Sequence, residues 1–495
     1  MTETAAIASS GPLERVKNRD LLRADSLING GWRGDEGRFS VINPADGAVL
    51  AEVADLGEAG ARAAVDAAAD GLAMWRKTSA FERAAKLKAW SDAILAARDD
   101  LAVLMTAENG KPLREARGEA VYAASFVEWS AEEAKRLHGD ILPSPYSGSR
   151  FFAFRQPIGV AGMVTPWNFP AAMITRKAAP ALAAGCSVVV KPAPETPLTA
   201  LALGQLALDA GLPPGVLNIV TGDAAAIGPV ITGDPRIAII GFTGSTAVGK
   251  MLMRQASETV KKVALELGGN SPFLVLEDAD VDAAAAGAMA AKFRGSGQVC
   301  VAANRLLVHE AVADAFVDAL HARMTEMRVD DGFASGVDAG PLIHDQALER
   351  VHGLVAQAQD AGAAVKLGGT RMDRPGSFYA PTLIDAVRPE MAIFGEEIFG
   401  PVAPVVRVKS DQEAFELANA TPWGLAAYVY AQDAGRIFKA IDALDTGMLG
   451  VNTGVVSHAS APFGGVKQSG IGREGGKWGV EEFTEVKFVN WAGLE

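Results

Sequence analysis

An alternation between short β-branched runs and Ala-rich stretches, which begins near residue 143, constrains the fold more than any other feature of this chain. Five runs are almost continuously apolar and predict strands. They lie at 160–164, 187–190, 216–220, 237–242 and 262–266. The stretches between them, such as 176–184 and 199–210, have helical composition. Strands that are apolar on both faces and joined by helices indicate a doubly wound parallel α/β sheet.

A second series of the same kind begins near residue 270. Its helices are predicted at 283–293 and 311–327, and a final strand-like piece, 483–491, follows a Gly-rich run at 464–479. Its strands are predicted at 273–276, 305–308, 402–408, 426–430 and 447–451. We therefore expect two α/β domains with a cleft between them, and ligands at the carboxyl ends of the strands.

The length supports more than one domain, because 495 residues exceed what one hydrophobic core usually supports. Residues 59–108 carry Leu, Ala and Trp at three- and four-residue spacing, which predicts helices. Residues 1–26 are polar and aperiodic, and we expect a loose arm there.

The charge balance excludes two classes of partner. The chain carries 46 Lys and Arg against 59 Asp and Glu, a net charge of −13, and it has no basic run. Nucleic acid and anionic membrane surfaces both require such a run, so we expect neither as a partner. The uncharged stretch 156–175 is interrupted by Pro157, Pro166 and Pro170, which excludes a transmembrane helix.

The few cysteine and histidine residues restrict which disulfides and metal sites the chain can form. Cys186 and Cys300 are the only cysteines, too few for a disulfide framework, which indicates a reducing compartment, the cytoplasm. The N-terminus shows no basic region followed by an apolar run, so we expect no signal peptide. The six His are scattered without metal-ligand spacing, and we expect no metal.

Cys300 lies at the end of FRGSGQVC (293–300), a Gly-rich turn between a predicted helix and a predicted strand. A lone Cys is usually a small core residue. A flexible turn that leads into a thiol is a poor place for core packing, so Cys300 is a candidate nucleophile. Cys186, in AGCSVV (184–189), is predicted to be structural.

Three further features stand at the ends of predicted strands. The loop GFTGSTAVGK (241–250) opens a helix, as phosphate-binding loops do, but Met251 replaces the Ser or Thr of a P-loop. Lys191 ends one strand, where it either meets a ribose or phosphate or is a solvated surface residue. Glu266 ends another, where it is either paired with a cation or kept for acid–base chemistry.

Six motifs, in this order and spacing, resemble those of the aldehyde dehydrogenase superfamily from about residue 27 to the end of the chain. They are TPWNFP (165–170), KPA (191–193), FTGST (242–246), LELGG (265–269), GQVC (297–300) and EEIFGP (396–401). Within that superfamily, MITRK (173–177), KFR (292–294) and PFGGVKQSG (462–470) most resemble the succinate-semialdehyde dehydrogenases. The resemblance implies two doubly wound α/β domains, a Rossmann-like cofactor domain and a catalytic domain, plus a small β oligomerisation arm.

The resemblance also implies domain boundaries and a homo-oligomer, either a dimer or a tetramer. It assigns 1–143 and 155–267 to the cofactor-binding domain, 268–455 to the catalytic domain, 456–479 to a loop of the substrate and cofactor cleft, and 144–154 and 480–495 to strands that bridge subunits.

By the same resemblance, the reaction is the oxidation of a semialdehyde on Cys300. The thiolate would attack the aldehyde carbon to give a thiohemiacetal, whose oxyanion the Asn168 amide would hold. After hydride transfer to NAD(P)⁺, Glu266 would activate the water that hydrolyses the thioester. Many members carry a second Cys two residues after the nucleophile, and because Ala302 stands there, we expect no redox switch.

The substrate hypothesis is electrostatic. Succinate semialdehyde carries a carboxylate opposite its aldehyde, and Arg176, Arg294 and Ser457 match the residues that resembling enzymes use for it. A guanidinium suits a carboxylate, although either Arg could instead pair with a neighbouring acid. Glutarate semialdehyde, one methylene longer, and a broader range of aldehydes stay open. Ester hydrolysis by Cys300 is a further alternative; a non-catalytic structural role is disfavoured, since nucleophile, base and oxyanion donor are all present.

The resemblance assigns the contacts to a dinucleotide cofactor as well. They are Thr165, Trp167, Lys191, Ala193, Pro194, Gly244, Ser245, Gly249, Leu267, Glu397 and Phe399. NAD-preferring relatives often carry Glu in place of Pro194, where it binds both ribose hydroxyls and would repel a 2′-phosphate. We therefore expect NADP to be preferred over NAD, with Glu195 facing away from the ribose as in an extended segment.

Overall fold

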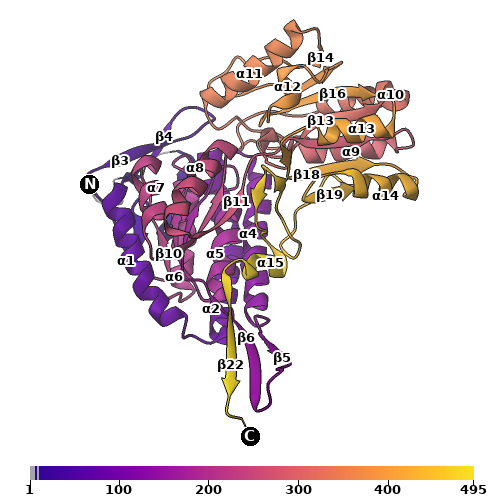
Figure 1. The fold of residues 1–495 in the computed structure, drawn as a ribbon. Helices are drawn as coiled ribbons and strands as arrows, with labels where there is room; N and C mark the ends of the chain where they lie inside the picture. Colours follow the sequence, from indigo (N-terminus) through magenta and orange to yellow (C-terminus); the bar gives the residue numbers. More distant parts are fainter. Residues whose placement is uncertain (1–5, 8–10, 495) are drawn as a thin grey trace.

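The computed structural model describes residues 6–7 and 11–494, which form two large sheets covered by helices and a narrow arm (Figure 1). The first sheet has its strands in the order β2 (Gly31–Arg33), β1 (Ser26–Ile28), β9 (Leu217–Ile219), β8 (Ser187–Lys191), β7 (Val160–Val164), β10 (Ile237–Thr243), β11 (Lys262–Glu266) and β21 (Gly470–Ile471). The five strands from β9 to β11 are parallel, and they are the five apolar runs of the first predicted series. That prediction is confirmed.

The second sheet contains the strands of the second series, together with two that the sequence did not predict. Its order is β14 (Ala364–Leu367), β15 (Thr382–Asp385), β16 (Val402–Val408), β13 (Ala303–His309), β12 (Ser271–Val275), β18 (Ala426–Tyr430) and β19 (Met448–Val451). All neighbours pair in parallel except β14 with β15. Strands β12 and β18 are buried along their whole length, as expected for a sheet with helices on both faces.

Helices cover both sheets. Those around the first sheet are α1 (Gly57–Trp75), α2 (Ala80–Ala96), α3 (Arg98–Asn109), α4 (Leu113–Ala134), α5 (Ala172–Ala184), α6 (Pro197–Asp209), α7 (Ala224–Gly233) and α8 (Thr246–Ala256). Those around the second are α9 (Val281–Lys292), α10 (Glu310–Thr325), α11 (Asp345–Asp360), α12 (Ala392–Gly395), α13 (Asp411–Asn419) and α14 (Ala434–Ala443). Helix α4 packs against α2, α3 and α5, which places it beside the boundary between the two sheets (Figure 1).

The N-terminal segment differs from the predicted loose arm. Residues 1–5 and 8–10 lie outside the described residues, but 12–15 and 19–21 form two short 3₁₀ helices. Leu13, Val16 and Leu21 are buried in the same core as α3 and α6. The prediction is wrong for this part because these few apolar residues follow no helical or strand period and are hidden among polar neighbours. The hairpin of β3 (Arg38–Ile42) and β4 (Val49–Ala54) was also missed.

A separate three-stranded sheet forms the arm at the end of the chain (Figure 1). It consists of β22 (Thr484–Ala492), β6 (Ser149–Pro157) and β5 (Asp140–Leu142), all antiparallel. The predicted strand at 483–491 is therefore confirmed to within one residue. Strand β5 and the second half of β6 were not predicted.

No helix among the described residues is long and apolar enough to cross a membrane. The uncharged stretch 156–175 folds as the end of β6, strand β7, a loop and the first turn of α5. The prolines identified in the sequence therefore separate short elements, as expected.

Candidate active site

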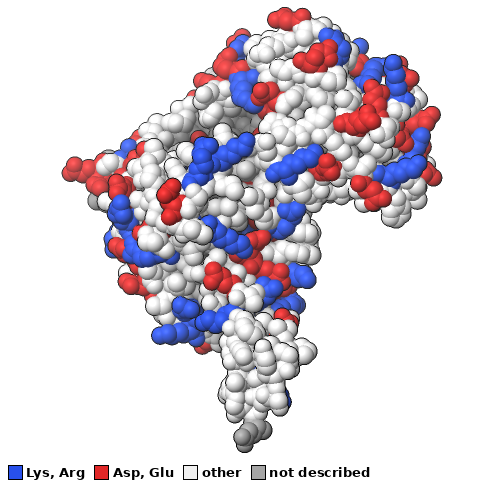
Figure 2. Space-filling model, in the orientation of Figure 1, with Lys and Arg blue, Asp and Glu red and all other residues white. Residues whose placement is uncertain are grey.

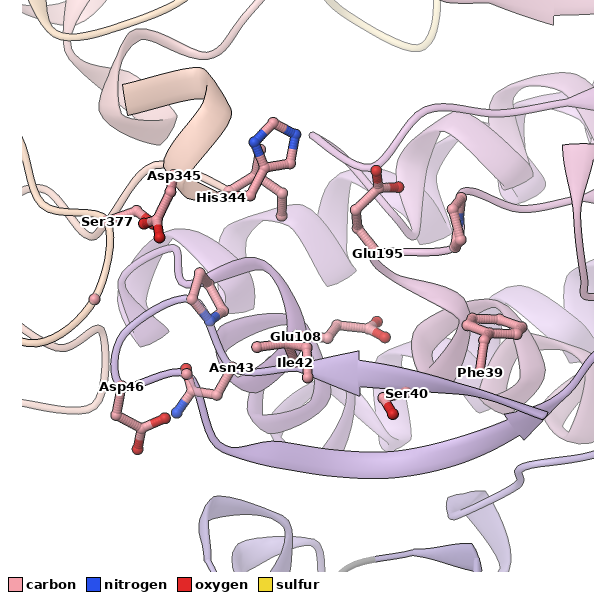
Figure 3. Close-up of a pocket in the computed structure, with 15 residues that line it drawn as sticks. Phe39, Ser40, Ile42, Asn43, Asp46, Glu108, Glu195, His344, Asp345 and Ser377 are labelled. Carbon is pink, nitrogen blue, oxygen red and sulfur yellow. The ribbon is translucent and has the colours of Figure 1, made fainter. Parts of the chain in front are cut away.

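Two cavities are candidates for the active site, and the charges of their lining residues distinguish them. One, of about 400 Å³, lies among hairpin β3–β4, the loop after β8 and the start of α11 (Figure 3). Asp46, Glu108, Glu195 and Asp345 line it, and its described lining residues include no Lys or Arg. An anionic aldehyde substrate would be repelled there, and the cavity contains no thiol to react with it.

The other cavity, of about 360 Å³, contains the predicted nucleophile. Its lining residues are Pro166, Trp167, Asn168, Thr243, Gly244, Ser245, Leu267, Gly268, Cys300, Arg350, Glu397 and Phe399. The structure thus brings two predicted catalytic residues, Cys300 and Asn168, together with several of the predicted cofactor contacts. We take this cavity as the candidate active site.

The two sheets contribute to the site from opposite strand ends. The first sheet supplies the loops after the carboxyl ends of β7, β10 and β11, as predicted. The second sheet supplies Cys300 and Glu397, which precede the amino ends of β13 and β16. The prediction that ligands bind at the carboxyl ends of the strands is therefore wrong for the second sheet. The chain passes from the end of β11 through 267–270 into the start of β12, so the cleft meets the second sheet at its amino end.

Three consecutive residues with positive φ shape the loop that precedes Cys300. Gly295, Ser296 and Gly297 have φ of 58°, 56° and 75°. A Cβ on Gly297 would lie 2.1 Å from the carbonyl oxygen of Gly400, so only glycine fits there. The Ser296 hydroxyl donates to the carbonyl of Gly340 at 2.9 Å, which holds the non-glycine residue in its unusual conformation.

Cys300 is partly exposed and otherwise enclosed by protein. Burial raises the pKa of the Cys300 thiol to about 12, while the positive charges of Arg176 and Arg294 act in the opposite direction. At neutral pH the thiol of the free protein is therefore protonated, and a base or a nearby positive charge must assist its ionisation. Cys186 is fully buried, and its Sγ lies 3.4 Å from the carbonyl oxygen of Phe483, consistent with a structural role.

Glu266 is a buried carboxylate at the end of β11, where the sequence placed it. Its Oε2 has no hydrogen-bond partner among the described residues. Burial, and then repulsion from Glu474, raise the pKa of Glu266 well above its usual value. A Cβ on Gly464 would lie 2.8 Å from its Oε1, so the glycine leaves room for the carboxylate. A buried carboxylate that is only partly satisfied and whose pKa is raised has the properties of a general base.

Asn168 lies next to the nucleophile loop. Its side-chain Nδ2 donates to the carbonyl of Gln298 at 3.0 Å, which leaves one amide hydrogen available and holds the side chain beside Cys300. Its backbone carbonyl accepts a hydrogen bond from Lys111 at 2.7 Å. Lys111 in turn forms a buried ion pair with Glu119.

Helix α4 supports these loops, and sequence reasoning missed this role. Glu115 accepts the N–H of Gly295 at 2.9 Å, and Glu119 accepts the N–H of Ala171 at 2.9 Å. The two acids are four residues apart and so lie on one face of the helix. Two acids on the packed face of an otherwise Ala-rich helix were the available signal in the sequence.

Glu397 and Phe399 come from the loop before β16. The Oε1 of Glu397 accepts the N–H of Gly269 at 3.2 Å, and burial raises the pKa of its carboxyl to about 7. Phe399 has a φ of 54° and packs edge-on against Trp167, with ring centroids 5.6 Å apart. Arg350, which the sequence did not single out, donates to the Glu397 carbonyl at 2.7 Å and fixes this loop.

Lys191 and its neighbours lie at the carboxyl end of β8. Lys191 is buried, and burial lowers the pKa of its ammonium group. The N–H of Thr165 donates to the Lys191 carbonyl at 3.1 Å, which joins the loops after β7 and β8. Ala193 is buried beside them.

Pro194 and Glu195 both line the acidic cavity of Figure 3. The extended segment, on which the prediction that Glu195 faces away from the ribose depended, is not observed: residues 193–196 form a turn, with the N–H of Thr196 bonded to the carbonyl of Ala193. The Glu195 charge is also close enough to Lys191 to raise its pKa.

The loop after β10 forms the other wall. Ser245 caps helix α8, and its hydroxyl accepts the N–H of Val248 at 3.3 Å. Gly249 packs against Leu267, since a Cβ there would lie 2.3 Å from Leu267 Cδ2. Gly244 and Ser245 thus stand at the start of a helix that faces the cavity, where backbone N–H groups favour an anionic ligand.

Arg176 is almost completely buried. It forms a buried ion pair with Glu474, which also pairs with Lys177. Its guanidinium stacks over the ring of Phe463, 4.1 Å from the centroid. Arg176 therefore does pair with an acid, but with one far away in the sequence and not with a neighbouring acid.

The other two predicted substrate residues are less constrained. Arg294 makes no ion pair within the described part of the chain, stands 5.5 Å from the Phe169 ring and lines a side cavity of about 590 Å³ with Glu115 and Val455. The Ser457 hydroxyl is hydrogen-bonded to Tyr122 Oη. Both Arg294 and Arg176 lie within electrostatic range of Cys300.

Among the described residues, no group of three or more His, Cys, Asp or Glu is placed so that it could hold a metal ion. Fold and site together define a class: a two-sheet α/β protein whose cleft holds a thiol, a buried carboxylate and a site suited to a nucleotide. Comparison with known proteins identifies the family.

The chain belongs to the aldehyde dehydrogenase family, whose model matches residues 32–489. It is 48% identical over 477 residues to the NADP(+) succinate-semialdehyde dehydrogenase GabD of Escherichia coli, covering 96% of this chain and 99% of that protein. It is 47% identical over 482 residues to the glutarate-semialdehyde dehydrogenase of Pseudomonas aeruginosa, covering 97% and 100%. The crystal structure of succinate-semialdehyde dehydrogenase from Burkholderia pseudomallei superposes with a TM-score of 0.96 at 49% identity, over 97% of this chain and 100% of that one.

These similarities extend over nearly the whole chain, so aldehyde oxidation with a nicotinamide dinucleotide is its activity. The predicted family and the mixed α/β fold are confirmed.

Proposed function

We propose that this protein oxidises succinate semialdehyde to succinate with NAD(P)⁺. The observation that carries the proposal is the placement of two guanidinium groups, those of Arg176 and Arg294, within electrostatic range of the thiol of Cys300. A substrate whose reactive carbon is bound at the thiol would hold its carboxylate near one or both of them. A desolvated contact of this kind contributes about 1.5–3 kcal/mol.

In the first step Cys300 Sγ forms a bond to the aldehyde carbon, and the carbonyl π electrons move to the oxygen. The Glu266 carboxylate accepts the thiol proton, assisted by the two nearby positive charges, and releases it to solvent before the hydrolysis step. The free amide hydrogen of Asn168 and the backbone N–H of Cys300 then donate to the oxyanion of the thiohemiacetal.

The residues of the nucleotide site suit NAD(P)⁺. The Glu397 carboxylate can accept from ribose hydroxyls, and the start of α8 at Ser245 offers N–H groups to a pyrophosphate. A nicotinamide held there would supply the hydride acceptor for oxidation of the thiohemiacetal to a thioester on Cys300.

Hydrolysis of the thioester completes the reaction. Glu266 removes a proton from a water molecule, whose oxygen attacks the thioester carbon. The C–S bond then breaks, Cys300 leaves as the thiolate and takes up a proton, and the carboxylic acid is released. The orphaned Oε2 of Glu266 is the atom to hold that water. The raised pKa of Glu266 makes it a stronger base than an exposed glutamate.

Glutarate semialdehyde is the second candidate, since a relative of nearly equal identity is named for that substrate. One methylene changes selectivity by about 1–3 kcal/mol, so the two substrates need direct comparison.

We also propose that NADP⁺ is preferred over NAD⁺. Pro194 provides no carboxylate at the position where one would repel a 2′-phosphate, and the buried Lys191 stands close by. The Escherichia coli relative is named for NADP(+). The negative charge of Glu195 opposes this preference, because it lies near Lys191.

A homo-oligomer assembled through the arm completes the proposal. The arm exposes large apolar side chains, among them Ile141 at 76%, Val486 at 63% and Trp491 at 58%. Figure 2 shows this part of the molecule almost free of charged side chains on the face in view. An apolar, hydrogen-bonding sheet is best covered by a second copy of the chain.

Steady-state kinetics on succinate semialdehyde, glutarate semialdehyde and butyraldehyde, each with NAD⁺ and NADP⁺, test the proposal. Cys300→Ala should abolish oxidation while it still binds the nucleotide, and Cys186→Ala is the matched control that should retain it. A wild type without preference for the carboxylated aldehydes would overturn the substrate assignment.

A further inference from the structure

Tyr122 is a half-buried polar residue near Arg176 that the proposed reaction does not use. It lies on α4, seven residues after Glu115 and three after Glu119, so the three side chains share the helix face that supports the site loops. Its phenol oxygen is hydrogen-bonded to the hydroxyl of Ser457, in the loop between β19 and β20 (Val466–Lys467). The helix therefore contacts a residue already assigned to the substrate carboxylate.

The residues around Tyr122 connect it to Arg176, another residue assigned to the substrate carboxylate. Its ring meets Phe126 edge-on, with centroids 4.8 Å apart, and the guanidinium of Arg176 stands 5.9 Å from the same Phe126 ring. Tyr122 is also close enough to Arg176 to interact with its charge. The hydroxyl pair of Tyr122 and Ser457 and the guanidinium of Arg176 thus lie close together.

The hydrogen count of the pair shows what it can still bind. Two hydroxyl groups carry two hydrogens, and only one of them can lie in the bond between the two oxygens. Neither hydroxyl has another hydrogen-bond partner among the described residues. One O–H is therefore uncommitted, and the nearby positive charge of Arg176 turns hydroxyl oxygens toward itself and their hydrogens away. That orientation suits an anion and not a cation.

We infer that Tyr122 is a specificity-determining residue whose hydroxyl, paired with that of Ser457, donates a hydrogen bond to the carboxylate of the semialdehyde substrate. The inference rests on the proposed function and adds to it a neutral donor pair beside the two arginines. A carboxylate that reaches the pair replaces the hydroxyl–hydroxyl bond with two charge-assisted bonds, which are the stronger kind.

The test compares Tyr122→Phe with the wild type, and Tyr146→Phe, an exposed tyrosine of the arm, serves as the matched control. Tyr122→Phe should lower kcat/KM for succinate semialdehyde about ten- to a hundredfold, mainly through KM, and leave butyraldehyde within about twofold. Ser457→Ala should behave alike, and the double variant should lose less than the product of the two single losses, because both act on one carboxylate.

A second readout needs neither cofactor nor turnover. Succinate should protect Cys300 from alkylation by iodoacetamide in the wild type and in Tyr146→Phe, and protect it at least tenfold less well in Tyr122→Phe. Thermal unfolding of each variant confirms that the fold is intact.

The outcomes separate the inference from the function on which it rests. A wild type that does not prefer succinate semialdehyde over butyraldehyde overturns the proposed function and the inference with it. A wild-type preference that survives in Tyr122→Phe, or a loss of equal size on both aldehydes, overturns the inference alone. The latter result would mean that Tyr122 only holds the Ser457 loop in place.

Discussion

Arg176 on α5 and Glu474 in the Gly-rich segment near the C-terminus form a buried ion pair beside the catalytic cleft. The pair has two consequences for the reaction. It holds the guanidinium proposed for the substrate carboxylate, and it fixes a negative charge close to Glu266. Removing one partner of a buried pair leaves the other charge uncompensated, which is costly.

Glu474→Gln should shift the pH dependence of thioester hydrolysis to lower pH. Glu266 acts as a base only when ionised, so the rate rises as pH rises through its pKa. Burial and the Glu474 charge raise that pKa, whereas Arg176 and Lys177 lower it. The substitution removes the repulsion and frees both cations to act on Glu266, so each change lowers the pKa. Single-turnover hydrolysis followed against pH measures the shift.

The matched control is Glu485→Gln, an exposed acid of the arm. A profile of Glu474→Gln that stays in place, or that moves to higher pH, would contradict the coupling between the two acids.

Glu266→Gln should slow deacylation more than acylation, since the amide cannot accept a proton from water. The expected trace in a stopped-flow experiment is a rapid burst of NAD(P)H followed by a steady state at least a hundredfold slower than that of the wild type. Loss of the burst itself would show that Glu266 is needed earlier, for ionisation of Cys300.

Arg294→Ala should lower kcat/KM for succinate semialdehyde by about ten- to a hundredfold and that for butyraldehyde far less. Arg294 forms no ion pair within the described residues, although its charge acts on the nearby Glu115, so Arg294→Ala breaks no direct pair. Arg114→Ala is the matched control, because Arg114 lines the same side cavity and its exposed side chain pairs with Asp338. Equal losses on both aldehydes would reject the carboxylate assignment.

Most of the parallel strands could be predicted from the sequence because their apolar runs are buried on both faces. The parallel strand β15 was missed although it is buried, because it has only four residues, of which Thr382 and Asp385 are polar. Strands β1 and β2 at the edge of the first sheet and the separate β3–β4 hairpin were missed because they are short and only partly apolar. The N-terminal helices were missed for a related reason: Leu13 and Leu21 are buried by tertiary contacts that no local period reveals.

Some residues of the candidate site could likewise be predicted from the sequence, and others could not. Cys300 could be predicted from the Gly-rich loop around it, and Glu266 from its place at the end of an apolar strand. The ion pair of Arg176 with Glu474 could not, because it joins segments far apart in the chain. Nor could the turn at 193–196, in which one hydrogen bond brings Pro194 and Glu195 to the same cavity.

Gly297→Ala should destabilise the protein and impair the nucleophile loop. A Cβ at this position would lie 2.1 Å from the Gly400 carbonyl oxygen, in a backbone conformation that already disfavours side chains. Gly336→Ala is the matched control, because its φ is +71° but nothing lies within 4 Å of the added carbon. Gly336→Ala should lower the free energy of unfolding by about 1 kcal/mol, through backbone conformation alone. Gly297→Ala should lower it by at least about 2 kcal/mol.

Calorimetric or denaturant unfolding measures both costs, and kcat measures the displacement of Cys300. Equal destabilisation of the two variants would show that the Gly400 contact adjusts without strain.

Cofactor preference should respond to the charge around Lys191. We expect the wild type to favour NADP⁺ over NAD⁺ in kcat/KM. Pro194→Glu should reverse the preference, since two like charges about 4 Å apart cost on the order of 4 kcal/mol near a surface. Glu195→Gln should strengthen the NADP⁺ preference, because it removes the acid that lies near Lys191 in the turn. A wild type that favours NAD⁺ tenfold or more, keeps this preference in Pro194→Glu and loses it in Glu195→Gln would show that Glu195 serves as the ribose-binding acid in place of residue 194.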